Sequence, residues 1–192
     1  MQHESSNTKL LIEQCQQGNQ LAEDQLFRLC YSQVAGICRR YSRSKEESEE
    51  MLNDCFFRMF KQLDKYDPSF DFSPWLRKLT VNCCLRYLQK YKGRLSFTEW
   101  NDDLIDGKFS ENKLPEAKDL NYLDLLHGLP EACKTIINLF VIEGYKHHEI
   151  AEMLNISVGT SKSNLHRAKK LLYDMVERAG KGKLKLKSNH GR

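Results

Sequence analysis

Residues 149–170, EIAEMLNISVGTSKSNLHRAKK, have the pattern of two short helices on either side of a tight turn. Apolar residues recur at helical spacing in the first helix: Ile150, Ala151 and Leu154. Ser157 ends the turn 155–157 and is placed to cap the free amides of the next helix. This order of helix, turn, cap and helix is typical of a helix-turn-helix that binds DNA.

The second helix of this pair is predicted to have an apolar side and a DNA-binding side. Val158, Leu165 and Leu172 are seven residues apart and are expected on the apolar side. Four polar side chains fall together on another face, where they reach base edges or phosphates in a major groove: Lys162, Ser163, His166 and Arg167. The alternative is a solvated basic helix on an ordinary helical domain.

Composition is consistent with one or two small soluble domains, since the 192 residues include 29% charged residues and the net charge is +4. Acidic residues gather in 45–54 and 102–124, whereas 77–94 and 162–192 are largely basic, so we expect two separate basic surfaces. The polar N-terminus and the lack of a long apolar run predict a cytoplasmic protein.

The seven cysteines lie mostly among apolar residues at helical spacing, without a CxxC pair or a Cys-His cluster spaced for zinc. We interpret them as buried thiols in a reducing compartment, and no metal or other cofactor is predicted.

The periodicity predicts an all-α fold of two small helical domains joined by a flexible linker, with the helix-turn-helix in the second domain. The predicted segments are a first domain (9–92), a linker (93–119), a second domain (120–178) and a basic, disordered tail (179–192). Within the first domain, residues 64–74, DKYDPSFDFSP, are expected to form an ordered loop leading into a helix over 75–91. In the second domain, Pro130 is expected to start a helix that Gly144 closes. The buried stripe of this helix is predicted to be Cys133, Ile136, Ile137, Phe140 and Val141.

Aromatic residues at the end of this loop lie beside polar, mostly basic residues of the following helix. The aromatic members are Phe70, Phe72 and Trp75, and the polar members are Arg77, Lys78, Asn82, Arg86 and Lys90. Flat apolar faces beside cations suit single-stranded or partly opened DNA, because stacking on an aromatic side chain contributes about 1–3 kcal/mol per base. The alternative for Trp75 is that it packs the loop onto the helices.

The sequence predicts no enzyme, since it lacks a P-loop, a Rossmann glycine pattern, a HExxH helix and a GxSxG elbow. His147, His148 and Glu149 invite a metal interpretation, but adjacent residues on a helix point in different directions. We interpret them as a polar helix start. A nucleic-acid enzyme is disfavoured because no acid, base or metal set can be assembled.

Three segments together resemble a bacterial RNA polymerase sigma factor of the extracytoplasmic-function (ECF) group. They are EEMLNDCFFRMF at 49–60, FSPWLRKLTVNCCLRYLQKYK at 72–92, and the long segment LPEACKTI…RAKKLL at 129–172. The resemblance implies that the first domain binds the polymerase clamp and the promoter's −10 element. It implies that the second domain binds the −35 element and the polymerase flap. The implied partners are core RNA polymerase, promoter DNA and an anti-sigma factor.

The resemblance also assigns site residues by position. The polymerase-binding residues would be Glu50, Asn53, Asp54, Phe57 and Arg58. For the −10 element the resemblance gives the loop 67–72 as the main contact, with Arg77 and Asn82 beside it. Together with the aromatic and basic residues described above, the predicted −10-binding residues are Asp67, Phe70, Phe72, Trp75, Arg77, Lys78, Asn82 and Arg86. The −35-binding residues would be Thr160, Lys162, Ser163, His166 and Arg167.

Five positions depart from the family pattern. Glu50 and Asn53 take the places of an acid-and-glutamine pair, and Lys146 stands where a capping serine or threonine is common. Ser161 replaces a valine, which is expected to weaken packing of the second helix, and His166 stands where an aromatic residue or arginine is frequent.

The predicted function is therefore promoter recognition and −10 strand opening for core RNA polymerase. A stand-alone helix-turn-helix transcriptional regulator is the alternative, and it has no need for the aromatic and basic residues in 64–92.

Overall fold

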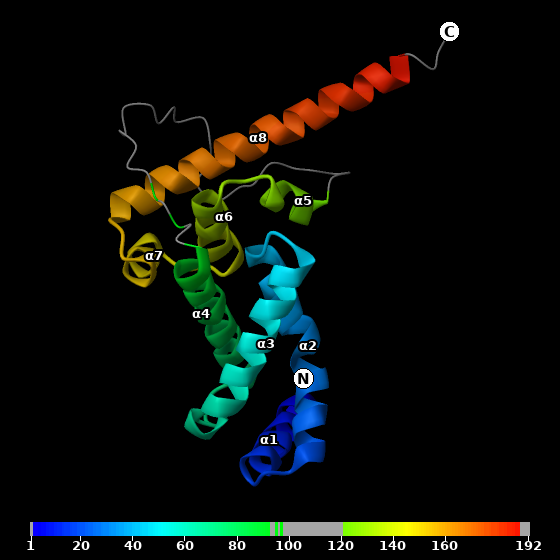
Figure 1. Cartoon of the computed structure of the whole chain (residues 1–192), viewed down its shortest axis with the longest axis vertical. Helices are drawn as coiled ribbons and strands as arrows, with labels where there is room; N and C mark the ends of the chain where they lie inside the picture. The colour runs from blue at the N-terminus through cyan, green and yellow to red at the C-terminus, as the bar shows by residue number, and fades with distance from the viewer. Residues whose placement is uncertain (1, 93–94, 96, 98–120, 189–192) are drawn as a thin grey trace. The chain divides into compact units, whose positions relative to one another are not determined.

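The structure is a computed structural model. It describes residues 2–92, 95, 97 and 121–188, with side chains for 7–90, 95, 97 and 121–179. Every regular element in these residues is helical, which confirms the predicted all-α class (Figure 1). Within the same residues, no helix combines the length and apolar content needed to cross a membrane.

The chain divides into two compact units, unit 1 (Met1–Gly93) and unit 2 (Arg94–Arg192). The predicted linker, residues 93–119, lies outside the described residues except for positions 95 and 97.

Unit 1 is formed by helices packed around α2. The elements are α1 (Gln2–Gln16), α2 (Gln20–Tyr41), α3 (Lys45–Gln62), the 3-10 helix η1 (Leu63–Lys65) and α4 (Phe72–Lys92). Helix α2 packs against α1, α3 and α4, and α3 also packs against α4. The most buried core side chains are Leu26, Val34, Tyr41, Met51, Met59, Leu76, Val81 and Leu88. Burying an aliphatic side chain of this size contributes about 1.5–3 kcal/mol, so this core holds the three long helices together.

Short connections in unit 1 depend on capping residues. Gly18 has a φ of +79°, which ends α1, and the side chain of Asn19 accepts hydrogen bonds from the N–H groups of Leu21 and Ala22 at the start of α2. Ser44 caps α3 in the same way by accepting from the N–H of Glu47 at 3.3 Å. These caps fix where each helix begins.

Helix α4 begins at Phe72, three residues before the predicted start at 75. Pro74 lies in the first turn, where the missing N–H of a proline would have no partner within the helix. The proline is therefore part of the helix start and does not belong to the preceding loop.

Unit 2 contains α5 (Tyr122–His127), α6 (Glu131–Ile137), the π-helical turn η3 (Asn138–Ile142), α7 (His147–Leu154) and α8 (Val158–Ser188). Helices α6 and α7 both pack against α8. Its most buried apolar side chains are Leu126, Ile136, Ile137, Leu139, Ile150, Ala168 and Leu172. Pro130 is the N-cap of α6 and Gly144 has a φ of +80° after η3, as the sequence predicts.

The turn η3 was not predicted from the sequence. The N–H of Glu143 bonds to the carbonyl of Asn138 at 2.9 Å, five residues back, which widens the helix by one residue. Phe140 and Val141, expected in the buried stripe, are only half-buried as a consequence.

Two expectations about α8 are wrong. Val158 is 42% exposed and therefore does not share the buried side of Leu165 and Leu172, because it is the first residue of the helix. The helix also continues to Ser188, into the tail 179–192 that was expected to be disordered. Lysine and leucine in GKGKLKLKS are good helix formers, which offsets the cost of about 1 kcal/mol for each of the two glycines.

Candidate nucleic-acid interface

The turn between α7 and α8 is a Schellman motif. Asn155 adopts the left-handed conformation with a φ of 54°. The N–H of Ile156 donates to the carbonyl of Ala151 at 3.0 Å, and the N–H of Asn155 donates to the carbonyl of Glu152 at 3.3 Å. Asparagine tolerates this conformation better than most residues, so the sequence itself stops α7 at this point.

Helix α8 starts with the predicted serine cap. The Oγ of Ser157 accepts a hydrogen bond from the N–H of Thr160 at 2.9 Å and lies 2.8 Å from the Oγ1 of Thr160. This contact confirms the capping role predicted for Ser157 and orients the first turn of the helix.

Helix α7 starts without a side-chain cap at Lys146. The carboxylate of Glu149 instead accepts a hydrogen bond from the N–H of Lys146 at 2.7 Å. This is the glutamate half of a capping box, and it supplies an acceptor that a lysine side chain lacks. The departure at Lys146 is therefore compensated within the same turn.

His147 connects three elements of unit 2. Its Nδ1 lies 2.9 Å from the Oγ of Ser161 on α8, and its ring stacks on Phe140 of η3 at 4.4 Å between centroids. Ser161 is fully buried. The serine that replaces the family's valine therefore exchanges an apolar contact for a polar one. Sequence reasoning missed this pair because the two residues are 14 positions apart.

The residues expected to contact the −35 element differ in exposure. Lys162 is exposed, and His166 and Arg167 are half-buried, whereas Thr160 and Ser163 are each only 6% exposed. The expected exposure of Ser163 is wrong, because its hydroxyl donates back to the carbonyl of Thr160 at 3.2 Å. Its role in base contact stays a prediction.

The segment 66–71 of unit 1, called the aromatic loop below, is ordered by its own hydrogen bonds. The side chain of Asp67 accepts from the N–H of Ser69 at 2.9 Å, and the N–H of Phe70 donates to the carbonyl of Asp67 at 3.1 Å. The hydroxyl of the buried Tyr66 donates to the carbonyl of Phe70. The bond from Ser69 also lowers the pKa of Asp67, since it stabilises the carboxylate.

Three aromatic rings hold this loop against the start of α4. The ring centroids of Tyr66, Phe72 and Trp75 lie 5.3–5.4 Å from one another. Phe72 and Trp75 are half-buried by these contacts, whereas Phe70 is 68% exposed. The packing alternative for Trp75 therefore has direct support, and Phe70 is the aromatic side chain that the loop presents to solvent. Tyr66 was not among the predicted residues, although it lies in the aromatic run.

A cavity of about 430 Å³ opens beside the aromatic loop. Its walls come from α1, α2, the loop and the start of α4, and include Lys9, Leu29, Gln33, Asp71 and Pro74. A reciprocal pair closes one side, since the side-chain amide of Gln33 donates to the carbonyl of Ser73 at 3.0 Å and its oxygen accepts from the Ser73 hydroxyl at 3.2 Å. Sequence reasoning did not predict that α1 and α2 contribute to this site.

The polar residues expected on α4 lie on its surface. Arg77, Lys78 and Arg86 are exposed and Asn82 is half-buried. Lys78, Asn82 and Arg86 are four residues apart and form one row along the helix. The two cations of this row, Lys78 and Arg86, are suited to following a phosphate backbone.

Helix α3 carries the residues expected to contact polymerase. Phe57 is 61% exposed, and Asn53 and Glu50 are also exposed. The Nε of Arg58 lies 2.8 Å from the Oδ2 of Asp54, and both side chains are half-buried. Asp54 and Arg58 therefore pair with each other along the helix.

Two further contacts extend this surface. The Tyr87 hydroxyl donates to the carboxylate of Glu50, and the ammonium of Lys61 lies 4.9 Å from the centre of the Phe57 ring. Glu50, Asp54, Arg58 and Phe57 are thus held in position before any partner binds.

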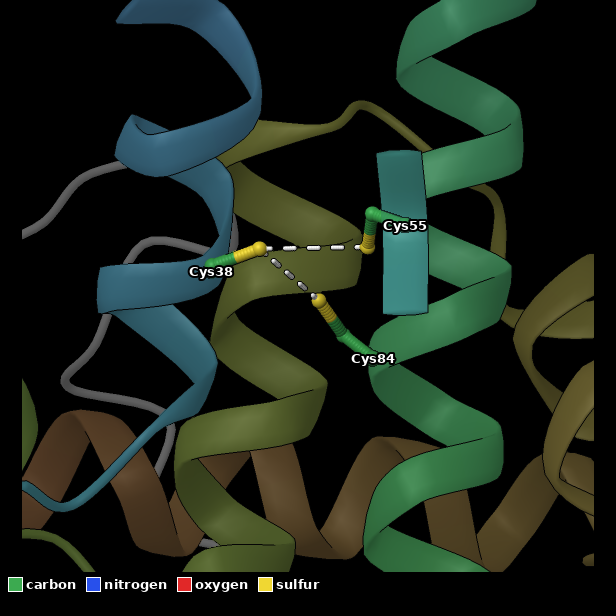
Figure 2. A group of neighbouring side chains, drawn as sticks. All are labelled: Cys38, Cys55 and Cys84. Atoms are coloured by element: carbon green, nitrogen blue, oxygen red, sulfur yellow. Dashed lines mark hydrogen bonds between the residues drawn. The ribbon is translucent and has the colours of Figure 1, made fainter. Parts of the chain in front are cut away.

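All seven cysteines are free and buried, as predicted. Three of them, Cys38, Cys55 and Cys84, form a cluster in the core of unit 1 that sequence spacing did not reveal (Figure 2). Among the described residues, this is the group of side chains with a geometry that can hold a metal ion.

The fold and its site define a helical protein with an aromatic, basic surface in one unit and a helix-turn-helix in the other. Residues 26–94 match the family "Sigma-70 region 2", and residues 119–172 match "Sigma-70, region 4". Together these matches cover more than half of the chain and include both units.

Two relatives are similar along nearly their whole length. The ECF RNA polymerase sigma-E factor of Haemophilus influenzae is 27% identical, over 91% of this chain and 97% of that protein. The ECF RNA polymerase sigma factor SigW of Bacillus subtilis is 26% identical, over 85% of this chain and 94% of that protein. The sigma factor RpoE of Bartonella quintana, solved in complex with the anti-sigma factor NepR, has the same fold. Its TM-score is 0.50 at 18% identity, over 80% of this chain and 96% of that one.

The chain belongs to the extracytoplasmic-function group of bacterial RNA polymerase sigma factors. Proteins of this family are transcription initiation factors that direct core RNA polymerase to promoters, and they are not themselves catalysts. A stand-alone regulator is disfavoured, because the family match extends over unit 1 as well as the helix-turn-helix.

Proposed function

We propose that unit 1 binds core polymerase through α3 and the opened −10 strand through the aromatic loop, while unit 2 binds the −35 element through α7 and α8. The observation that carries this proposal is the exposed ring of Phe70 on an ordered loop beside a cavity of about 430 Å³. An unstacked base gains about 1–3 kcal/mol by stacking on such a ring, which is comparable to the cost of leaving the duplex.

The −10 strand would continue from the aromatic loop along α4. Arg77, Lys78 and Arg86 offer exposed cations, and Asn82 offers an amide that bonds bases or sugars. Asp67, Phe72 and Trp75 would support the site by shaping the loop, since their side chains bond or pack within it.

The −35 element would meet the first three turns of α8. Lys162 is exposed near the helix start, where it suits a phosphate. Thr160 would lie beside the same phosphate, and its hydrogen bond to the Ser157 cap holds it in place. His166 and Arg167 present side chains one turn later and are suited to base edges. Ser163 can contribute only if DNA binding turns its hydroxyl away from the carbonyl of Thr160.

Core polymerase would bind the exposed side of α3. Phe57 and Asn53 are available for direct contact, and the Asp54–Arg58 and Glu50–Tyr87 pairs present fixed charges around them. An aromatic side chain flanked by fixed charged groups is typical of a protein-binding hot spot.

The test is transcription by reconstituted holoenzyme on promoters randomised at both elements. The aromatic loop, residues 66–71, is exchanged for the corresponding loop of the Bacillus subtilis relative. We expect the −10 preference to change and the −35 preference to remain. If the loop variant makes a normal amount of transcript and its −10 preference is unchanged, the assignment of the aromatic loop is contradicted. Lys162→Ala is the matched control, since it is expected to affect −35 binding alone.

The partners proposed are core RNA polymerase, promoter DNA and an anti-sigma factor. The Bartonella quintana relative forms a complex with the anti-sigma factor NepR, and an inhibitor that covers α3 would block polymerase binding here as well. We propose that the protein acts in the cytoplasm, where polymerase and promoter DNA are found, and that it needs no cofactor for promoter recognition.

A further inference from the structure

Three cysteine side chains meet in the core of unit 1, and each comes from a different helix. Cys38 lies on α2, Cys55 on α3 and Cys84 on α4, and each is at most 1% exposed. The Sγ of Cys38 is 3.9 Å from that of Cys55 and 4.0 Å from that of Cys84, and all three Sγ atoms lie within 4.8 Å of one another. Figure 2 shows the three side chains pointing toward one another.

These separations fit a metal ion at the centre of the triangle. Metal–thiolate bonds are about 2.3 Å long, and three sulfur atoms at that distance around one centre in a plane are about 4.0 Å apart. The group contains three ligands among the described residues, whereas a structural zinc site takes four. We propose that Cys38, Cys55 and Cys84 form a three-sulfur site for a soft monovalent cation of the copper(I) type.

The ligand atoms of the site favour a soft ion, because sulfur ligands select metals such as copper(I). Metal-bound cysteines are thiolates, so binding releases the protons of all three thiols to solvent and changes the oxidation state of neither sulfur nor metal.

A bound ion would connect α2, α3 and α4 at a single point. These helices carry the aromatic loop and the surface proposed to bind polymerase. A ligand that binds only the folded state stabilises it by an amount that grows with ligand concentration over Kd. The stability of unit 1, and with it the capacity for promoter binding, would therefore rise with the supply of copper(I).

The experiment uses the full chain, reduced and kept without oxygen, with copper(I) supplied from a competing chelator. We expect one copper per chain, an ultraviolet sulfur-to-copper absorption band, three sulfur neighbours by X-ray absorption, and an increase in Tm. Zinc offered at the same concentration should not be retained.

Variants separate the cluster from other cysteines. Cys38→Ala should lower copper(I) affinity at least tenfold. Cys30→Ala is a matched control, because Cys30 is also a buried thiol on α2 with its pKa raised to about 12 by burial. Cys133→Ala is a second control in unit 2. Both controls should bind copper as the parent does.

If circular dichroism shows that Cys38→Ala does not fold, Cys84→Ala and the sulfur count of the parent decide the question. The proposal is overturned if the parent retains no copper, if it has fewer than three sulfur neighbours, or if copper lowers its Tm. It is also overturned if the control variants lose binding as strongly as the cluster variants, or if zinc is retained in place of copper.

Discussion

The two units assemble their candidate DNA surfaces over different sequence distances. In unit 2, the turn and caps that orient α8 are made between residues at most five positions apart, such as Ile156 and Ala151. In unit 1, the cavity beside the aromatic loop joins Asn7 to Leu76, and Gln33 bonds to Ser73 across 40 positions. The orientation of α8 is therefore set mainly by local chain geometry, whereas the unit 1 site exists only when the helices pack.

The largest expected effect tests whether unit 1 depends on its own core. Leu26 is completely buried, so Leu26→Ala should destabilise unit 1 by about 2–5 kcal/mol. Hydrogen exchange followed by mass spectrometry should show lost protection in α2, α3 and α4, with α6 to α8 unchanged. Leu172→Ala, at an equally buried position in unit 2, should give the reverse pattern. Equal loss of protection in both units would show that they unfold together.

The next effect concerns the proposed −10 contact. Phe70→Ala should weaken holoenzyme binding to a single-stranded −10 oligonucleotide by about 1–3 kcal/mol, because a stacking surface is lost. Its effect on folding should stay below about 0.5 kcal/mol, since the side chain is mostly exposed.

Phe57→Ala is the matched control, since it removes another exposed phenylalanine of unit 1. It should weaken core polymerase binding, measured by titration with labelled protein, and leave the −10 affinity of assembled holoenzyme unchanged. Equal −10 affinity of the Phe70→Ala and parent holoenzymes would remove Phe70 from the site.

The difference between the units also explains what could be predicted from the sequence. The Ser157 cap, the turn around Asn155 and the helix start after Pro130 follow from residue types and short spacings. The pairing of His147 with Ser161, the contribution of α1 to the cavity and the meeting of three cysteines depend on tertiary packing. No spacing rule of a single helix contains that information.

Some predictions were wrong although they concerned only local structure. Helical periodicity placed Ser163 on the DNA-binding face, but it carries no information about a hydroxyl that bonds back to the carbonyl of Thr160. Periodicity also assumed a regular helix through Phe140, whereas the π-helical turn at Asn138 changes the register. Hydrogen bonds of this kind decide whether an individual side chain is exposed, and they do not change the fold class.

A third prediction tests the local geometry of unit 2. Asn155→Val should destabilise this unit by about 1–2 kcal/mol, because a β-branched residue is strained at a φ of 54°. Asn155→Gly should keep or raise stability, since glycine accepts that conformation. Denaturant unfolding followed through amides of α7 and α8 measures both. Comparable stability of the two variants would mean that the turn does not control how the helices are joined.

A fourth prediction asks how strongly packing adds to this local geometry. A double-mutant cycle of His147→Ala and Ser161→Ala should give a coupling energy of about 0.5–1.5 kcal/mol, as expected for one hydrogen bond. Unfolding of the four proteins of the cycle supplies the measurement. Glu149→Ala in place of His147→Ala should give no coupling to Ser161, because its bond is to the N–H of Lys146. Additive effects at His147 and Ser161 would show that this contact does not hold α7 on α8.

The smallest expected effect separates attraction to the DNA backbone from sequence recognition on α8. Lys162 is exposed and suits a phosphate, so Lys162→Ala should weaken −35 binding on all sequences and reduce the salt dependence by about one unit of slope. His166→Ala should mainly change which −35 bases are preferred, and Arg167→Ala can do either, since arginine binds both guanine and phosphate.

Ser163→Ala sharpens this last test, because the hydroxyl already bonds to the carbonyl of Thr160. We expect it to change base preference less than His166→Ala does. Holoenzyme binding to −35 libraries at two salt concentrations measures all four variants together. A larger preference change in Ser163→Ala than in His166→Ala would show that DNA binding releases the serine from Thr160. Identical preferences in all four would mean that α8 positions the protein without recognising sequence, and unit 1 would then supply the promoter specificity.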